Sequence, residues 1–96
     1  MEFKFKEKRN VAVYTLRQIF DFNKPILLVS HNIEDGAWQF LTGEAASIED
    51  AMIVGLDEIV KHDQSLNELF DLPKGWEAKR KYIGGKWARK QQERRE

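Results

Sequence analysis

Two histidines and the carboxylates near them are the side chains in this sequence best suited to chemistry. His31 is followed by Glu34 and Asp35, a spacing that could present an imidazole and two carboxylates to a metal ion from one turn. Turns are rich in aspartate and glutamate for conformational reasons alone, so the same residues are typical of an ordinary turn. His62 lies near the end of an expected helix, where a positive charge interacts favourably with the helix dipole. We therefore expect no metal site.

The sequence also lacks a convincing set of residues for nucleophilic catalysis. Ser30 and His31 are neighbours on an expected strand, so their side chains point to opposite faces and cannot act as a dyad. The chain has no cysteine, which excludes thiolate chemistry, disulfides and cysteine-ligated zinc. Gly84 and Gly85 precede Lys86 and Trp87 rather than the Lys-Ser/Thr pair of a phosphate-binding loop. We expect a protein that is not an enzyme and that binds no cofactor.

The formal net charge of zero hides a strong asymmetry along the chain. Residues 1–33 hold six Lys/Arg and three Asp/Glu, residues 34–71 hold one base and ten acids, and residues 72–96 hold nine bases and three acids. The three segments therefore carry +3, −9 and +6, and the field near any one surface depends on this local charge.

The acidic middle segment predicts a surface that binds a basic protein, because complementary charge steers association. A toxin that acts on nucleic acid would be one such partner. The residues that we expect to form this surface are Glu34, Asp35, Asp57, Glu58, Glu68 and Asp71.

The basic C-terminal segment supports an alternative, binding of nucleic acid. Lysines and arginines there alternate with Trp76, Tyr82 and Trp87, the mixture of charge and stacking that single-strand binders use. The acidic segment would repel phosphates, however, and so small a protein needs its tryptophans in the core. The residues of this alternative are Lys79, Arg80, Lys81, Lys86 and Arg89.

Length and composition indicate one small domain. A chain of 96 residues fits a single domain, and 42% hydrophobic with 33% charged residues is typical of neither a disordered nor a membrane protein. The longest apolar run, 25–29, is far shorter than the roughly 20 residues that span a bilayer, and residues 1–10 lack the apolar region of a signal peptide. We expect a cytoplasmic protein that does not bind membranes.

Hydrophobic periodicity predicts an α+β fold, with a mostly antiparallel sheet of four to six strands and two or three short helices. Trp38 and Phe40 are two residues apart on an expected strand, so both should face the core. Thr15 and Gln18 fit a capping box for a short helix. Residues 51–55 fit either a strand or a helix, and Gly55 favours a strand. We expect residues 1–10 to be an N-terminal extension or edge strand, 11–88 a single α+β domain, and 89–96 a charged, disordered tail.

The order of three segments resembles a small bacterial family grouped with the immunity-protein thirty-three type of domain. The segments are KPILLVSHNIEDGAWQFLTG, AMIVGLDEIVKHDQSLNELFDLPKGW and AKRK, within residues 11–88. The shared features are a hairpin ending in W-x-F-L-x-G, the pattern V-x-L-x-x-I before a helix, and an L-P-x-G-W turn. The resemblance implies a bacterial immunity protein that binds a toxin, and it carries no catalytic residue over to this chain.

Overall fold

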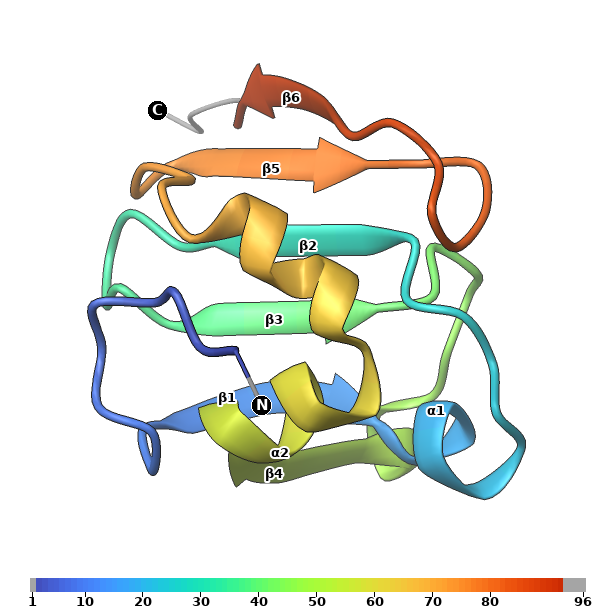
Figure 1. Cartoon of the computed structure of the whole chain (residues 1–96). Helices are drawn as coiled ribbons and strands as arrows, with labels where there is room; N and C mark the ends of the chain where they lie inside the picture. The colour runs from blue at the N-terminus through green and yellow to red at the C-terminus, as the bar shows by residue number, and fades with distance from the viewer. Residues whose placement is uncertain (1, 93–96) are drawn as a thin grey trace.

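A computed structural model describes residues 2–92, which form a mixed six-stranded sheet covered on one face by short helices (Figure 1). The strands are β1 Ala12–Leu16, β2 Leu28–His31, β3 Trp38–Leu41, β4 Ala51–Gly55, β5 Trp76–Lys79 and β6 Ala88–Gln91. The helices are α1 Arg17–Asp21 and α2 Leu56–His62, with the 3₁₀ helices η1 Ile48–Asp50 and η2 Gln64–Leu69. The predicted α+β class is confirmed.

The strand order in the sheet is β4-β1-β3-β2-β5-β6. Four of the five neighbouring pairs are antiparallel, and only β1 and β3 run parallel. The sheet is therefore mostly antiparallel, as predicted, but mixed. Strands β4 and β6 form its two edges.

The core lies between the sheet and a layer built from α2, η2 and the N-terminal segment (Figure 1). Trp38 and Phe40 both face this layer and are buried, as their spacing predicts. Asn67 of η2 fastens the N-terminal segment, because its side chain accepts from the Lys4 N–H and donates to the Glu2 carbonyl. Phe5 is buried against Trp38, with an edge-to-face geometry.

The structure bears on four of the predictions made from the sequence. Residues 51–55 are a strand, as favoured. Residues 2–10 contain no strand and belong to the domain, since Phe5 lies in the core. Residues 89–91 are part of β6 rather than of a disordered tail, because β6 pairs with β5 along its length; residues 93–96 of that expected tail lie outside the described residues. The Thr15 hydroxyl donates to the Phe40 carbonyl and does not cap α1.

Within residues 2–92, no helix is both long and apolar enough to cross a membrane.

Candidate protein-binding surface

The face of the sheet opposite the helices is the surface of interest. Strand register places one residue from each strand in a row across this face, and the row changes in character from apolar at β4 to charged at β6. The row runs through Ile53, Tyr14, Gln39, Ser30, Glu77 and Lys90. We call this face the open face, because no helix of residues 2–92 lies over it (Figure 1).

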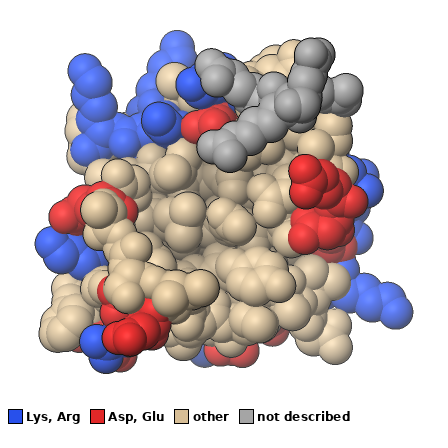
Figure 2. Space-filling model, turned by 180° about the vertical axis from the view of Figure 1, so that it is seen from behind, with Lys and Arg blue, Asp and Glu red and all other residues tan. Residues whose placement is uncertain are grey.

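The half of the open face nearest β4 exposes large apolar side chains. Tyr14 is 44% exposed, Ile53 is 62% exposed, and Ile48 of the neighbouring η1 is 90% exposed. Figure 2 shows this side of the molecule as a broad uncharged area with charged residues around its margin. Contiguous exposed apolar surface of this kind often marks a site of protein association.

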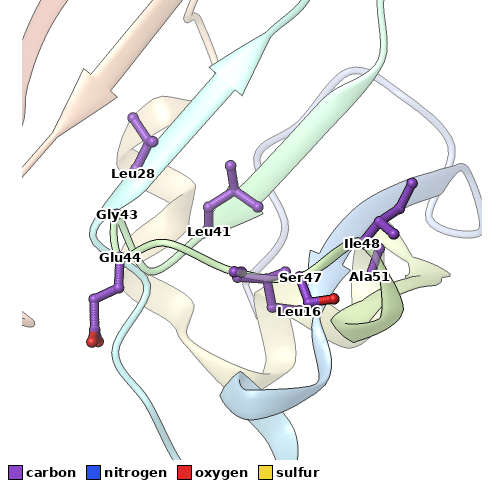
Figure 3. A pocket seen from close by; sticks show the side chains of 9 residues that line it. Leu16, Leu28, Leu41, Gly43, Glu44, Ser47, Ile48 and Ala51 are labelled. Carbon is purple, nitrogen blue, oxygen red and sulfur yellow. The ribbon is translucent and has the colours of Figure 1, made fainter.

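A shallow groove of about 430 Å³ opens on the same face, beside the connection from β3 to β4 (Figure 3). Its apolar floor comes from Leu28 and Leu41, which face each other across β2 and β3, and its wall includes Ile48. The Glu44 carboxylate lies at the rim of the groove, 3.7 Å from the Lys24 ammonium. The groove is open to solvent and its floor is apolar.

The acidic residues expected to form a binding surface do not share one location. Glu34 and Asp35 lie in the turn between β2 and β3, where the Asp35 carboxylate accepts from the Ala37 N–H at 2.9 Å. Asp57 and Glu58 lie in the first turn of α2, which follows β4, and Glu58 accepts from the Gly55 N–H at 3.3 Å.

The last two acidic residues lie on the helical layer. Glu68 is in η2 and Asp71 follows it, so neither belongs to the open face. The hydrogen bond from Arg89 at 2.8 Å holds the pKa of Asp71 below its usual 3.8. Asp71, an expected residue of the acidic binding surface, is therefore paired with Arg89, an expected residue of the nucleic-acid-binding alternative.

A second pair of carboxylates lies at the other end of β4. Glu49 and Asp50 end η1 immediately before the strand. Arg17 donates to Asp50 at 3.0 Å, and this hydrogen bond is the main cause of the lowered pKa of Asp50. Acidic side chains therefore lie at both ends of β4.

Arg80 does not belong to an exposed basic surface, which corrects the nucleic-acid expectation at that position. Its guanidinium is buried and donates to the Ile26 carbonyl, the Ser65 hydroxyl and the Asp63 carboxylate. The same group lies 4.2 Å from the centre of the Trp87 ring. Arg80 therefore joins the end of β5 to the helical layer.

The remaining basic residues of that expectation are exposed. Lys79 ends β5, and Lys81 and Lys86 lie in the loop that leads to β6. Tyr82 in this loop is also exposed, whereas Trp76 and Trp87 pack partly buried against the core. Only one of the three expected stacking rings is freely available.

His31 occupies a packing position, whereas His62 at the end of α2 is exposed, with its ring centre 4.8 Å from that of Phe20. His31 faces the core, where its Nδ1 lies 2.7 Å from the Leu72 carbonyl and its ring stacks on Trp38 at 4.0 Å. Ser30 points to the open face, as strand alternation requires, and hydrogen-bonds Gln39. Among residues 2–92, no three His, Asp or Glu side chains come together in a way that could hold a metal ion.

Sequence reasoning missed Tyr14 and Ile53, although a signal for them was present. Strand β4 reads AMIVG, so it has apolar residues on both faces and no charge. A strand with one solvated face normally alternates apolar with polar residues. An uncharged strand at the edge of a sheet is therefore a sign of an exposed apolar face.

The chain matches no family model, and searches of curated proteins and of solved structures also gave no match.

Proposed function

We propose that this protein is a non-enzymatic binding protein, and that its open face docks a partner protein which presents apolar side chains within a basic margin. The proposal rests on one observation above all. Tyr14 and Ile53 are neighbours in register on adjacent strands, and both remain exposed on a face that carries no covering layer in residues 2–92.

The groove and the carboxylates support the same proposal. The groove floored by Leu28 and Leu41 offers an anchor pocket, the feature around which binding energy concentrates in protein interfaces. The carboxylates at both ends of β4 lie at the margin of the apolar area, so they favour a partner with basic residues at matching positions.

A toxin that acts on nucleic acid fits this partner chemistry, because it must itself carry a basic surface. An immunity protein of the kind that the sequence resembles would bind such a toxin and block its basic site. The class of partner thus agrees with the resemblance, and the experiment below tests the surface independently of it.

The test compares two aromatic residues of equal exposure on opposite sides of the molecule. Tyr14 on the open face and Phe70 beside the helical layer are each 44% exposed. We expect Tyr14→Asp to abolish direct binding to a partner that has been captured, purified and reconstituted with the wild-type chain. Phe70→Asp should leave that binding unchanged. Loss of binding in Phe70→Asp with retention in Tyr14→Asp would move the site to the helical layer and overturn the proposal.

A second candidate function, binding of single-stranded nucleic acid, is favoured by one observation. The loop between β5 and β6 exposes Tyr82 beside Lys81 and Lys86, which gives a stacking ring next to two phosphate-binding charges. Such binding weakens steeply as salt rises. Titration of labelled single strands at low and at moderate salt tests it, and no binding at low salt removes this candidate.

A further inference from the structure

We propose that β4 accepts an extended segment of the partner protein as an added strand, and that this segment has an apolar centre flanked by lysine or arginine. The inference rests on the proposed function, since it specifies how a partner engages the apolar half of the open face. β4 is an edge strand, and its outer side is available for pairing.

The hydrogen-bond pattern of β1 and β4 identifies the backbone groups that are available. The Leu56 N–H donates to the Val11 carbonyl at 2.8 Å, and this pair continues the β1–β4 register by one position. Hydrogen-bonded and non-hydrogen-bonded pairs alternate along an antiparallel ladder. Met52 and Val54 therefore bond to β1, and the N–H and carbonyl of Ile53 point away from it.

The backbone groups on either side are partly used within the chain. The Ala51 N–H donates to the Ile48 carbonyl, and the Gly55 N–H donates to the Glu58 carboxylate. Ile53 is thus the centre of the free edge. A strand that pairs there would place alternate side chains beside Ile53 on the open face, so that the row through Ile53 and Tyr14 gains one more residue at its β4 end.

The two edge strands of the sheet differ in how strongly they discourage pairing with a strand of another molecule. Strand β6 carries Arg89 and Lys90, and charged residues of this kind discourage pairing with another strand. Strand β4 has no charged or proline residue over its five positions. An uncharged edge next to an exposed apolar face is the arrangement that strand addition requires.

Charge specifies what kind of strand fits. Glu49 and Asp50 precede β4, and Asp57 and Glu58 follow it, so carboxylates lie at both ends of a strand that is about 17 Å long. Opposite charges on directly facing strand positions stabilise the pair. Asp50 already pairs with Arg17 and Glu58 accepts from the Gly55 N–H, so Glu49 and Asp57 are the carboxylates that can meet a new cation. An added segment with a basic residue on each side of its apolar centre therefore fits β4 and its two ends.

The same charges disfavour a second copy of this chain as the occupant. Two β4 strands related by a two-fold axis at Ile53 would run antiparallel, with residue numbers that sum to a constant across the pair. Glu49 of one copy would then face Asp57 of the other at both ends of the pair. Like charges directly opposite each other are destabilising, so β4 is better suited to a basic partner than to itself.

The experiment uses the full chain and a synthetic peptide of about nine residues in which valine and threonine alternate between two pairs of lysines. A control peptide replaces the lysines with glutamates. We expect the lysine peptide to bind about tenfold or more tightly than the control, and to slow hydrogen exchange of the Ile53 amide by a similar factor. Equal binding of the two peptides, no binding of the lysine peptide, or unchanged exchange at Ile53 overturns the inference.

Variants at Ile53 separate the edge from the face. Ile53→Pro removes the outward N–H and leaves the bonds from residues 52 and 54 to β1, so we expect loss of peptide binding. Ile53→Val keeps the N–H and should bind the peptide as the wild type does. If Ile53→Pro does not fold, hydrogen exchange in the wild type separates the edge from the face, because a peptide that binds the face alone leaves the Ile53 N–H free to exchange. A concentration-dependent dimer that Ile53→Pro abolishes identifies a second copy as the occupant and overturns the inference.

The purified partner distinguishes failure of this inference from failure of the proposed function. Tyr14 lies on an interior strand, so Tyr14→Asp alters the face without removing a free backbone group of β4. If Tyr14→Asp loses binding of the partner while Ile53→Pro binds it fully, strand addition is refuted and the proposed docking face is still supported. Retention of the partner in both variants refutes the two proposals together.

Discussion

The Arg80 guanidinium donates to the Asp63 carboxylate at 2.6 Å, and the Arg80 side chain has no exposed surface. The pair joins the end of β5 to the junction between α2 and η2. Ser65 and the Ile26 carbonyl accept further hydrogen bonds from the same guanidinium, so its donors are directed at three acceptors on two segments. Arg80, although it lies in a basic run of the sequence, thus links the sheet to the helices through hydrogen bonds.

Replacement of this arginine should therefore affect stability rather than binding. We expect Arg80→Met to lower the free energy of unfolding by about 3 kcal/mol, because it leaves the nearly buried Asp63 carboxylate without its cation. Urea denaturation followed by tryptophan fluorescence measures the change. Lys81→Met, at the exposed neighbouring position, should change stability by less than about 0.5 kcal/mol. Equal stability of the two variants would show that the pair contributes little.

The sequence could predict the features of this fold that depend on local patterns. The two-residue spacing of Trp38 and Phe40 correctly places both in the core. The apolar run 25–29 overlaps β2, which is an interior strand. The Ser47 hydroxyl accepts from the Glu49 N–H at the start of η1, and a serine just before acidic residues is typical of a helix start. In each case the physical cause lies within a few residues.

Features that depend on contacts between distant segments could not be read from the sequence. The parallel pairing of β1 with β3 has no local signature. The burial of Arg80 depends on Asp63, which is 17 positions away, and a Lys-Arg-Lys run by itself is typical of a solvated surface. The local sequence around Thr15 fits a helix cap, but the Thr15 hydroxyl donates to the Phe40 carbonyl on the adjacent strand.

Only part of the candidate site could be predicted from the sequence. The excess of acidic residues at 34–71 indicates a basic partner, and the structure distributes those residues over three segments. Several of them also serve local roles, such as Asp35 in its turn and Asp71 beside Arg89. The apolar half of the open face follows from which side the helices cover, so it could be recognised only once the topology was known.

The N-terminal segment should contribute to stability although the expected domain begins at residue 11. Phe5 is buried against Trp38, and its truncation leaves a cavity in the core. We expect Phe5→Ala to lower the free energy of unfolding by about 3 kcal/mol or more. Phe22→Ala, at an exposed position, should have an effect below about 0.5 kcal/mol. Thermal unfolding of the two variants tests this, and matching midpoints would show that residues 2–10 are dispensable.

Gly75 combines a left-handed backbone with close packing, so it should tolerate alanine poorly. Its φ is +85°, and a Cβ atom there would lie 3.3 Å from the Ile33 side chain. Gly43 has nearly the same φ, +84°, but open space around the Cβ position. We expect Gly43→Ala to cost about 1 kcal/mol from backbone strain and Gly75→Ala about 2 kcal/mol. Urea denaturation of both variants isolates the packing contribution, and equal losses would contradict it.

The ion pair between Arg89 and Asp71 should make stability depend on pH in the acidic range. The hydrogen bond from Arg89 lowers the pKa of Asp71 in the folded state from the usual 3.8. A group with a lowered folded-state pKa stabilises the fold above its unfolded-state pKa, and this contribution disappears as the pH falls through the folded-state value. The wild type should therefore be more stable than Asp71→Asn near neutral pH, and the difference should close below 3.8. Because both side chains are partly exposed, the difference should be small and should shrink as salt is added.

Denaturation of the wild type and Asp71→Asn across the acidic range measures this difference in stability. In the Arg89→Gln background, Asp71→Asn should have no further effect. A difference that persists at low pH, or that survives in the Arg89→Gln background, would assign the effect to a contact other than this pair.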